Sequence, residues 1–386
     1  MRVKLKDIFD LQMGKTPSRS NLEYWNTTDY KWISIADLTK TSKYIFETKE
    51  YLSKSAIKDS GIKVIPANTV VMSFKLSIGK TAITKEDMYS NEAIMAFKDK
   101  HVINIIPEYI FYLFKYKNWE EGSNKAVMGK TLNKATLSEI EVEICSIEKQ
   151  RQIVNILDKI MSAVDGRKQE LQLLDELIKA RFVEMFGDPV ANDKGWKMKP
   201  LLDMGKCKNG MNFHYDDSGV EISCLGVGDF KDLSVIDNTK KLSIVSLNEM
   251  PSEEYLLKDG DIVFVRSNGN KDLVGRSLAI YPGKLPTTFS GFCIRYRIHD
   301  DEITVPYLLR VLKMESMRKK MAGRGANIQN LNQQILGTLV IPVPPIELQN
   351  QFVDFVRAID KSKVAVQKAL DETQILFDSL MQKYFG

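Results

Sequence analysis

Lysine, arginine, asparagine and glutamine side chains gather in a few glycine-containing segments of this sequence. These residue types hydrogen-bond to base edges and phosphate oxygens, and nearby glycines let backbone amides approach a phosphate closely. We therefore predict loops that contact nucleic acid, although surface loops facing only solvent have a similar composition. The candidates in the first half are Lys15, Thr16, Arg19, Lys75, Lys80, Lys125 and Lys130. Those in the second half are Asn209, Asn212, Arg266, Asn268, Lys271, Arg276, Arg324, Asn327 and Gln329.

Motifs for catalysis or cofactor binding are not found. Gly-Lys-Thr occurs at Gly14, Gly79 and Gly129, but a phosphate-binding P-loop needs another glycine five residues earlier, where phenylalanine, phenylalanine and asparagine stand. No Gly-x-Gly-x-x-Gly follows a predicted strand, and no Asn/Asp-Pro-Pro-aromatic tetrapeptide occurs. The four cysteines form no Cys-x-x-Cys pair, and the three histidines lie far apart in the sequence. We expect no catalytic residue, metal ion or cofactor on this chain.

The sequence repeats once, and this repeat organises the whole chain. With an offset of 199 residues, segment 144–153 matches 343–352, and the register needs no gap from Pro107 to Gly187. Earlier in the chain, an offset of 192 pairs segment 34–38 with 226–230 and 69–72 with 261–264. The period is far longer than the roughly 20–50 residues of solenoid repeats. We predict two copies of one mixed α/β unit, each followed by a long helix.

Each repeat ends in a segment that predicts one long helix, at 147–187 and again at 346–386. The first has no internal proline, and Gly187 followed by Asp-Pro is a strong stop signal. About 38 helical residues would span roughly 57 Å. Its heptad positions Leu157, Val164, Leu171, Ile178 and Met185 are all apolar, whereas its companion heptad series is interrupted by Arg167 and Arg181. Lys363 and Thr373 interrupt the seam of the second helix.

The two long helices need a partner, because a single amphipathic helix cannot bury its apolar stripe alone. One possibility is that each helix packs on its own globular segment. We favour packing of the helices on each other as an antiparallel coiled coil, since two repeats related by a twofold axis would place them antiparallel. The helices would then act as a spacer of fixed length between the globular segments.

The globular segments, 1–146 and 188–345, have the α+β pattern of short strands and few helices. We predict a short helix over Leu5–Met13 and helices starting at Pro107 and Pro306. Strands are predicted at 31–35, 69–74 and 93–97, and in the second repeat at 221–225, 261–265 and 293–298.

Composition and charge agree with a globular protein of this plan. The 386 residues carry 55 Lys plus Arg and 50 Asp plus Glu, a net charge of +5, which permits nucleic-acid binding through local basic patches. The most apolar stretch, 101–114, is too short and too polar to cross a membrane. The N-terminal segment lacks the apolar stretch of a signal peptide, and the low cysteine content favours the reducing cytoplasm.

The chain resembles the specificity subunit of a type I restriction–modification system over nearly its full length. Both long helices begin with an Ile-Glu-x-Gln-x-Gln motif, at Ile147 and Ile346, and a glycine-containing loop precedes a Leu-Asn pair in each repeat. Pro342-Val-Pro-Pro and the segment from Phe182 to Pro189 add to the resemblance. The family usually has Pro-Pro before each helix, whereas Cys145-Ser146 stands before the first helix here.

The resemblance implies two target-recognition domains, each reading one half of a split double-stranded DNA site, with pseudo-twofold symmetry and helical arms that set the spacer. It also implies docking of two modification subunits, which hold S-adenosylmethionine and methylate adenine, and of restriction subunits that cleave DNA with ATP and Mg²⁺. The arm residues that we assign to partner binding are Gln150, Gln152, Ile153, Gln349, Gln351 and Phe352.

Two other functions fit parts of the same sequence. A two-lobed scaffold that binds only proteins would have the same repeat, and salt-dependent DNA binding would distinguish it from a specificity subunit. An enzyme whose site is assembled across the two lobes is the third possibility, and the missing motifs argue against it.

Overall fold

The structure is a computed structural model, and it describes residues 1–75, 77–119, 132–213, 218–230, 235–322 and 330–386. The chain divides into two compact units. The first unit comprises Met1–Gln169 and Gln367–Gly386, and the second comprises Glu170–Val366. Each unit therefore combines one globular segment with part of both long helices, α6 (Ile147–Phe186) and α11 (Ile346–Phe385).

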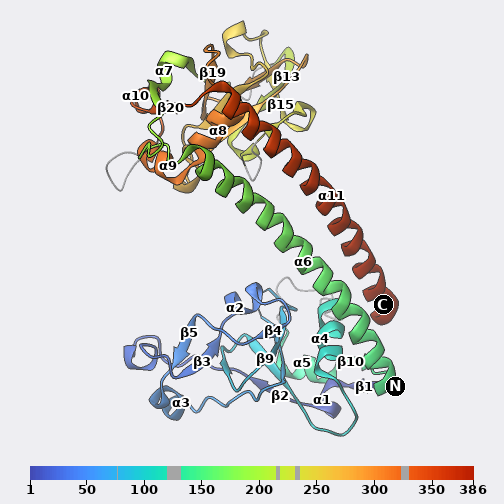
Figure 1. The fold of residues 1–386 in the computed structure, drawn as a ribbon. Coiled ribbons are helices and arrows are strands. Elements are labelled where there is room, and N and C mark those ends of the chain that lie inside the picture. The colour runs from blue at the N-terminus through green and yellow to red at the C-terminus, as the bar shows by residue number, and fades with distance from the viewer. Residues whose placement is uncertain (76, 120–131, 214–217, 231–234, 323–329) are drawn as a thin grey trace. The chain divides into compact units, whose positions relative to one another are not determined.

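The first unit is built around a five-stranded sheet (Figure 1). Its strand order is β2 (Phe9–Met13), β9 (Ile94–Asp99), β6 (Val70–Ser73), β7 (Thr81–Thr84) and β4 (Tyr44–Ile45). A three-stranded sheet has the order β5 (Glu50–Leu52), β3 (Tyr30–Ile33) and β8 (Tyr89–Ser90), and β1 (Arg2–Lys4) pairs with β10 (Glu141–Glu143). The helices are α1 (Leu5–Ile8), α2 (Ile35–Lys40), α3 (Lys54–Ser60), α4 (Pro107–Tyr116) and α5 (Lys134–Glu139), with a 3-10 turn at Leu22–Tyr24.

The second unit repeats this topology strand for strand. Its five-stranded sheet has the order β12 (Gly205–Asn209), β19 (Cys293–Ile298), β16 (Asp261–Val265), β17 (Ser277–Ile280) and β14 (Val235–Ile236). The smaller sheets are β15 (Ser243–Leu247), β13 (Val220–Leu225) and β18 (Thr287–Phe289), and the pair β11 (Lys197–Pro200) with β20 (Val340–Val343). Its helices are α7 (Leu201–Met204), α8 (Val305–Lys313), α9 (Glu315–Ala322) and α10 (Gln333–Gly337), with 3-10 turns at Val227–Asp229, Thr239–Lys241, Glu253–Tyr255 and Lys271–Leu273.

The cores explain why the central strands and helices form where they do. β6 and β16 are buried along their whole length and consist mostly of β-branched and aromatic or sulfur-containing side chains. α4 starts with Pro107 in its first turn, where a missing N–H is tolerated, and buries every side chain from Tyr109 to Phe114. In the second unit α8 buries Tyr307, Leu308, Leu309, Val311 and Leu312 in the same way.

The long helices run antiparallel where they meet in each unit. In the first unit the N-terminal part of α6, with Ile153 and Leu157, shares a core with Phe377 and Met381 of α11. In the second unit Phe182 and Phe186 near the end of α6 pack on Phe352 near the start of α11, with ring centroids 5.4 and 5.6 Å apart.

The predicted fold class, two tandem α+β units with long helices that pair antiparallel, is confirmed. The prediction for Leu5–Met13 is partly wrong, because only Leu5–Ile8 is helical. Phe9 and Leu11 continue as strand β2, in which Phe9 pairs with Asp99 and Met13 with Met95 of β9. Burial of Phe9 and Leu11 in the core beneath the sheet outweighs the local helical pattern.

Candidate nucleic-acid interface

In the first unit, three chain segments converge at one end of the five-stranded sheet. β2 ends there, β9 begins there and β6 ends there. Backbone hydrogen bonds hold the segments together: the amide of Gly14 donates to Ile94 (3.1 Å), that of Lys15 to Ser90 (2.8 Å) and that of Phe74 to Ala93 (2.9 Å). We call residues 14–19, 74–80 and 90–93 the first reading edge; the placement of residue 76 is not described.

Side chains of the first reading edge are tied to its framework. Arg19 forms an ion pair with Glu50, and its guanidinium carbon lies 3.7 Å from the ring centroid of Trp25. Thr16 donates a hydrogen bond to Glu92, and this bond lowers the pKa of the Glu92 carboxyl, with Lys75 and Arg19 adding to the effect. Arg19 and Thr16 are therefore held in place, and the carboxylate of Glu92 is stabilised among cations.

The second unit builds the same edge from different residues. The amide of Gly210 donates to Cys293 (3.0 Å) and that of Arg266 to Phe292 (2.7 Å), in the way that Gly14 and Phe74 do in the first unit. The amide of Leu331 donates to the carbonyl of Arg266 (2.7 Å), which adds a fourth segment. We call residues 209–212, 265–268, 290–292 and 330–333 the second reading edge.

The predicted polar residues of the second unit lie on this edge or beside it. Asn209 accepts a hydrogen bond from Gln333 (3.2 Å), and Arg266 donates to the carbonyl of Gly291 (3.3 Å). Asn212 is exposed, whereas Arg266 and Asn268 are half-buried. Arg276 follows Gly275 at the start of β17 and donates to the carbonyl of Phe230 (3.4 Å).

Two matched glycines are required by close backbone approach at these edges. A Cβ atom on Gly14 would lie 2.2 Å from the carbonyl oxygen of Asn91, and one on Gly210 would lie 2.1 Å from that of Ser290. Both distances are far below contact, so the strands can come together only if these positions lack a side chain. Gly14 and Gly210 are thus required for the close backbone packing that forms the reading edges.

Lys75 and Lys80 also lie on the first reading edge, whereas six other sequence candidates cannot be assigned to an edge. Lys75 is half-buried, with its ammonium nitrogen 5.7 Å from the ring centroid of Phe74, and Lys80 is exposed next to Gly79. The side chain of Lys271 is not described. The candidates that lie outside the described residues are Lys125, Lys130, Arg324, Asn327 and Gln329.

Two residues of the reading edges were not predicted from the sequence. Phe292 is 60% exposed at the tip of the second edge, although most large aromatic side chains of this unit are buried. Glu92 lies at the corresponding turn of the first edge. The repeat offset of 199 aligns Phe292 with Ala93, beside Glu92, so a comparison of the two turns could have singled out this position.

Four of the residues assigned to partner binding are buried inside their own units, and their contact with a partner subunit stays a prediction: Gln150, Ile153, Gln349 and Phe352. Gln150 accepts a hydrogen bond from the amide of Ile106 and donates to two backbone carbonyls, and each of these bonds is 3.0 Å long. Gln349 makes the same three kinds of bond at the start of α11.

The remaining two arm candidates, Gln152 and Gln351, are exposed, and their partner contacts stay a prediction.

Among the described residues, no cluster of His, Cys, Asp or Glu could hold a metal ion, and no helix is long and apolar enough to span a membrane. The four cysteines are free thiols. Burial raises the pKa of the Cys207, Cys224 and Cys293 thiols to about 12, so these groups stay protonated at neutral pH.

The family model described as "Type I restriction modification DNA specificity domain" matches residues 1–176 and 193–373, once in each repeat. The chain belongs to this family. It is a specificity subunit of a type I restriction enzyme, the noncatalytic part of a restriction–modification complex.

Related specificity subunits align with nearly the whole chain. The MjaIX specificity subunit of Methanocaldococcus jannaschii is 25% identical, with 98% of this chain and 91% of the relative covered. The StySPI specificity subunit of Salmonella potsdam is 24% identical, with 92% and 82% covered.

Solved structures support the fold. A structure from work on complex assembly and conformational transition of the type I restriction–modification system has a TM-score of 0.63 at 16% identity, covering 100% of this chain and 97% of the other. The S subunit from M. genitalium has a TM-score of 0.53 at 15% identity, covering 100% and 96%.

Proposed function

We propose that this specificity subunit recognises a bipartite double-stranded DNA target, with each reading edge contacting one half-site. The observation that carries the proposal is the duplicated edge: both units bring corresponding segments together with the same backbone hydrogen bonds but with different side chains. Because base identity is read by side chains in the grooves, edges of different sequence should read different half-sites. A pseudo-twofold relation between the units would let them read opposite strands.

The arms would set the number of base pairs between the half-sites. α6 and α11 are continuous helices of 40 residues each, and both units take part of each helix. Two readers on one face of B-form DNA need to lie about one helical turn apart, roughly 34 Å, or a multiple of it. A paired-helix spacer of roughly 60 Å is long enough to hold them at such a distance.

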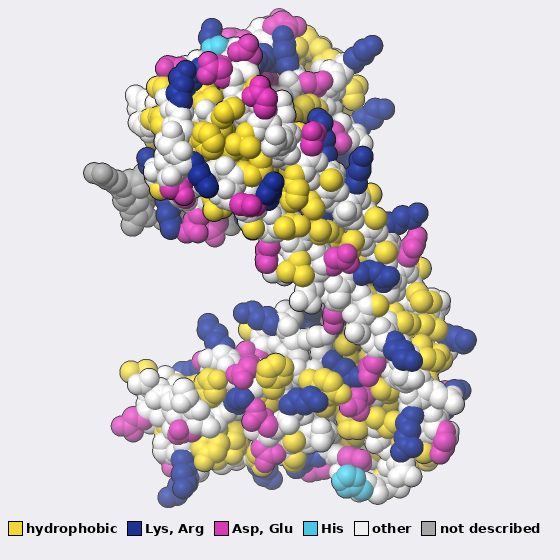
Figure 2. Space-filling view, viewed as in Figure 1, with side chains coloured by type: hydrophobic (Ala, Val, Ile, Leu, Met, Phe, Trp, Pro, Cys, Tyr) yellow, Lys and Arg dark blue, Asp and Glu magenta, His cyan; other side chains and the backbone are white. Residues whose placement is uncertain are grey.

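Exposed apolar side chains on the arms would dock partner subunits. In the second unit Leu173 and Leu177 are 55% and 46% exposed, and in the first unit Ile375 and Leu376 are 68% and 50% exposed. Figure 2 shows apolar side chains on the exposed surface of these helices. Leu177 and Leu376 occupy the same position of the repeat, so two copies of one modification subunit could bind in the same way.

The partner subunits would carry out the chemistry. Modification subunits would hold S-adenosylmethionine and methylate adenine, and restriction subunits would use ATP and Mg²⁺ to cleave DNA. The specificity subunit would hold none of these groups itself, and it would direct them to the target in the cytoplasm.

Methylome sequencing of cells that express the chain with its modification subunits tests the proposal. We expect one bipartite methylated motif, and Arg266→Ala should weaken or relax only the half-site read by the second unit, because Arg266 lies on the second reading edge. Lys284→Ala, an exposed lysine outside both edges, is the matched control. Methyl transfer by the purified chain alone would contradict the proposal. Affinity for duplex DNA that does not fall as the salt concentration rises would also contradict it, and would favour a scaffold that binds only proteins.

A further inference from the structure

A groove of about 770 Å³ in the first unit lies where α4, β10 and the two long helices meet. Met1 and Gly386, marked N and C in Figure 1, both line it. Apolar side chains are open to the groove, since Met1 is 66% exposed and Phe385 is only half-buried. Tyr109 and Tyr116 of α4 flank Phe385, with ring centroids 5.4 and 6.4 Å from that of its ring. The groove therefore combines an aromatic wall with accessible apolar surface.

The second unit has a chain segment at the corresponding place. The repeat offset of 199 aligns Gly386 with Gly187. The register of β1 on β10 and of β11 on β20, compared with the same offset, aligns Met1 with Lys197. Residues 188–196 join Gly187 to Lys197, so this segment occupies in the second unit the place that the groove has in the first.

Segment 188–196 is held against the end of α6 by specific contacts. The indole N–H of Trp196 donates a hydrogen bond to the carbonyl of Phe186 (3.0 Å), and Val190 packs on the core of the unit. Asn192 fixes the shape of the segment, because its side chain accepts from the amide of Trp196 and donates to the carbonyl of the same residue, at 2.9 Å each. Phe186 is only 1% exposed beneath this segment, whereas Phe385, at the same position of the repeat, is half-buried.

The end of α11 offers the same hydrogen-bond acceptor as the end of α6. Phe186 and Phe385 are the last residues of the two helices, and the last carbonyls of a helix have no partner within that helix. In the second unit the indole of Trp196 supplies a donor at this position. Tryptophan suits the place because it joins a large apolar ring system to a single N–H donor. An indole in the groove beside Phe385 would find an acceptor and aromatic neighbours there.

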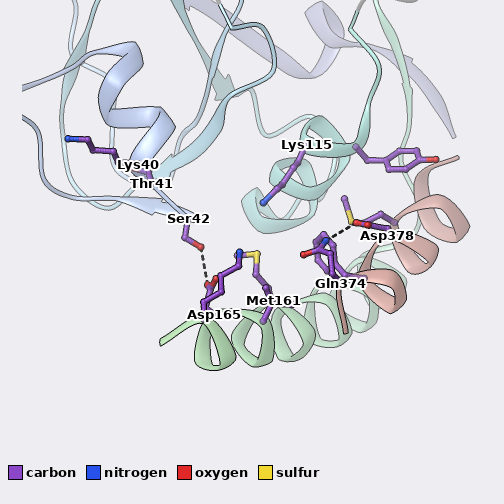
Figure 3. A pocket seen from close by; sticks show the side chains of 13 residues that line it. Lys40, Thr41, Ser42, Lys115, Met161, Asp165, Gln374 and Asp378 are labelled. Carbon is purple, nitrogen blue, oxygen red and sulfur yellow. Dashed lines mark hydrogen bonds between the residues drawn. The ribbon is translucent and has the colours of Figure 1, made fainter. Parts of the chain in front are cut away.

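A second groove of the first unit, of about 630 Å³, is matched by a groove in the second unit (Figure 3). It is lined by Lys115 and Asp165, and Asp165 accepts a hydrogen bond from Ser42 (3.2 Å). The groove at the corresponding place of the second unit has about 370 Å³, and Lys313 is among the residues that line it. A groove that recurs in both repeats is a product of the shared fold, whereas the groove at Phe385 marks a place where the repeats differ.

We propose that the groove at Phe385 is a docking site for a partner subunit of the restriction–modification complex, which inserts a segment that carries a tryptophan. The indole N–H would donate to the carbonyl of Phe385, and apolar residues of the segment would cover Phe385 and Met1. Tryptophan is a frequent anchor of protein interfaces. One such segment would bind per chain, because residues 188–196 take the equivalent place in the second unit. This surface is separate from the exposed leucines of the arms, and it involves no contact with DNA.

A fluorescent peptide with the sequence of residues 188–196 tests the groove directly. The full chain is titrated into the peptide, and fluorescence anisotropy should show saturable binding of one peptide per chain. Trp196→Ala in the peptide should weaken binding by at least about tenfold, because it removes the anchor. Lys149→Trp in the chain should also weaken it, since Lys149 lines the groove and a larger side chain would fill it. Lys159→Trp, an exposed position of the same helix outside the groove, is the matched control.

A chain that carries a copy of residues 188–196 directly before Met1 tests the partner. This extension puts a tryptophan next to Met1, as Trp196 stands next to Lys197. It should raise the unfolding temperature and lower the affinity for the modification or the restriction subunits by at least about tenfold, because it fills the groove. The same extension ending in alanine should leave both quantities near those of the parent chain.

The outcomes separate the groove from its partner and from DNA recognition. Absence of peptide binding, or peptide binding that Lys149→Trp leaves unchanged, would overturn the groove as a docking site. Peptide binding together with unchanged assembly of the extended chain with both kinds of subunit would overturn the partner. Neither measurement uses DNA, so a failure of the proposed DNA recognition would leave these results unaffected.

Discussion

At the scale of single residues, Gln150 and Gln349 show how each arm is fixed to its unit. Both are fully buried near the start of a long helix, and each side chain accepts from one backbone amide and donates to two backbone carbonyls. They therefore orient the arm on the segment that leads into α4 or α8. At these two positions, the Gln motif that marks the family in this sequence therefore has a structural role.

Removal of these buried hydrogen bonds should destabilise the chain. We expect Gln150→Ala to lower the free energy of unfolding by about 2–3 kcal/mol, because it leaves buried backbone groups without partners. Urea unfolding of the full chain measures the change. Gln152→Ala, two residues away and exposed, should cost less than about 0.5 kcal/mol. Equal effects of the two substitutions would contradict the role assigned to Gln150.

Lys313 should make stability depend on pH. Its pKa is about 8 in the folded chain against an ordinary value of 10.5, and the unfolded chain therefore binds more protons between these values. The charged form of Lys313 lowers the free energy of unfolding below pH 8, and this loss disappears as the pH rises toward 10.5. We expect Lys313→Met to be more stable than the parent at pH 7, with the difference shrinking between pH 8 and 10.5.

Thermal or urea unfolding across this pH range checks the prediction for Lys313. Titrations of other groups are common to both chains and cancel in the difference. Lys284→Met should show no pH-dependent difference from the parent, because Lys284 is exposed. A difference that stays constant from pH 7 to 10 would show that the Lys313 ammonium is not held at a lowered pKa.

At the scale of elements, the long helices pair with polar residues matched across the seam. Arg167 of α6 donates a hydrogen bond to Thr373 of α11 in the first unit, and Lys363 of α11 lies 2.8 Å from Asp175 of α6 in the second. Three of the four residues that interrupt the apolar heptads thus find partners on the facing helix, whereas Arg181 pairs with Glu184 of its own helix. Matched polar pairs in an apolar seam favour one register of the helices.

The arms allow a direct test of the spacer. Four residues inserted after Gln169 and four after Val366, at the borders of the two units, add about 6 Å to each helix. With a base-pair rise of about 3.4 Å, we expect the spacer of the methylated motif to grow by one or two base pairs with unchanged half-sites. Methylome sequencing reads both quantities. New half-sites with the old spacer length would reject the arms as the ruler.

At the scale of the whole molecule, duplication makes each unit depend on both repeats. The first unit buries Phe377 and Met381 from the end of the second repeat, and the second unit buries Ile178 and Phe182 from the end of the first. Neither repeat by itself buries the whole apolar stripe of its own helix. The repeat in the sequence and the compact unit in space are therefore different divisions of the chain.

A single repeat should consequently form a dimer. In fragment 1–187 the side of α6 that packs on α11 is uncovered, including Ile153 and Leu157. Because α11 is the repeat equivalent of α6, a second copy of the fragment can supply the missing helix. We expect twice the fragment mass by light scattering in the micromolar range and a monomer for the full chain. A fragment that stays monomeric and folded would show that α6 needs no partner helix.

Much of this architecture could be predicted from local pattern. The period of the repeat, the strands at Asp261–Val265 and Cys293–Ile298 and the start of both arms follow from apolar periodicity and from stop signals such as Gly187. Leu5–Met13 could not be predicted fully, because pairing of β2 with β9 is a long-range interaction. The burial of Gln150 and Phe352 could not be predicted for the same reason, since a motif does not reveal which of its side chains turn inward.

The order of residues alone is enough to predict a duplicated α+β chain with two long helical arms and basic, glycine-containing loops. Apolar periodicity, charge and self-similarity are properties of the sequence, so they can be recognised without the tertiary structure. The folded chain was needed to show that three or four distant segments meet at each reading edge, that Phe292 lies exposed there and that Lys115 and Lys313 line grooves in the two units. These features depend on which distant segments pair, and pairing is settled by burial and backbone hydrogen bonding of the whole fold.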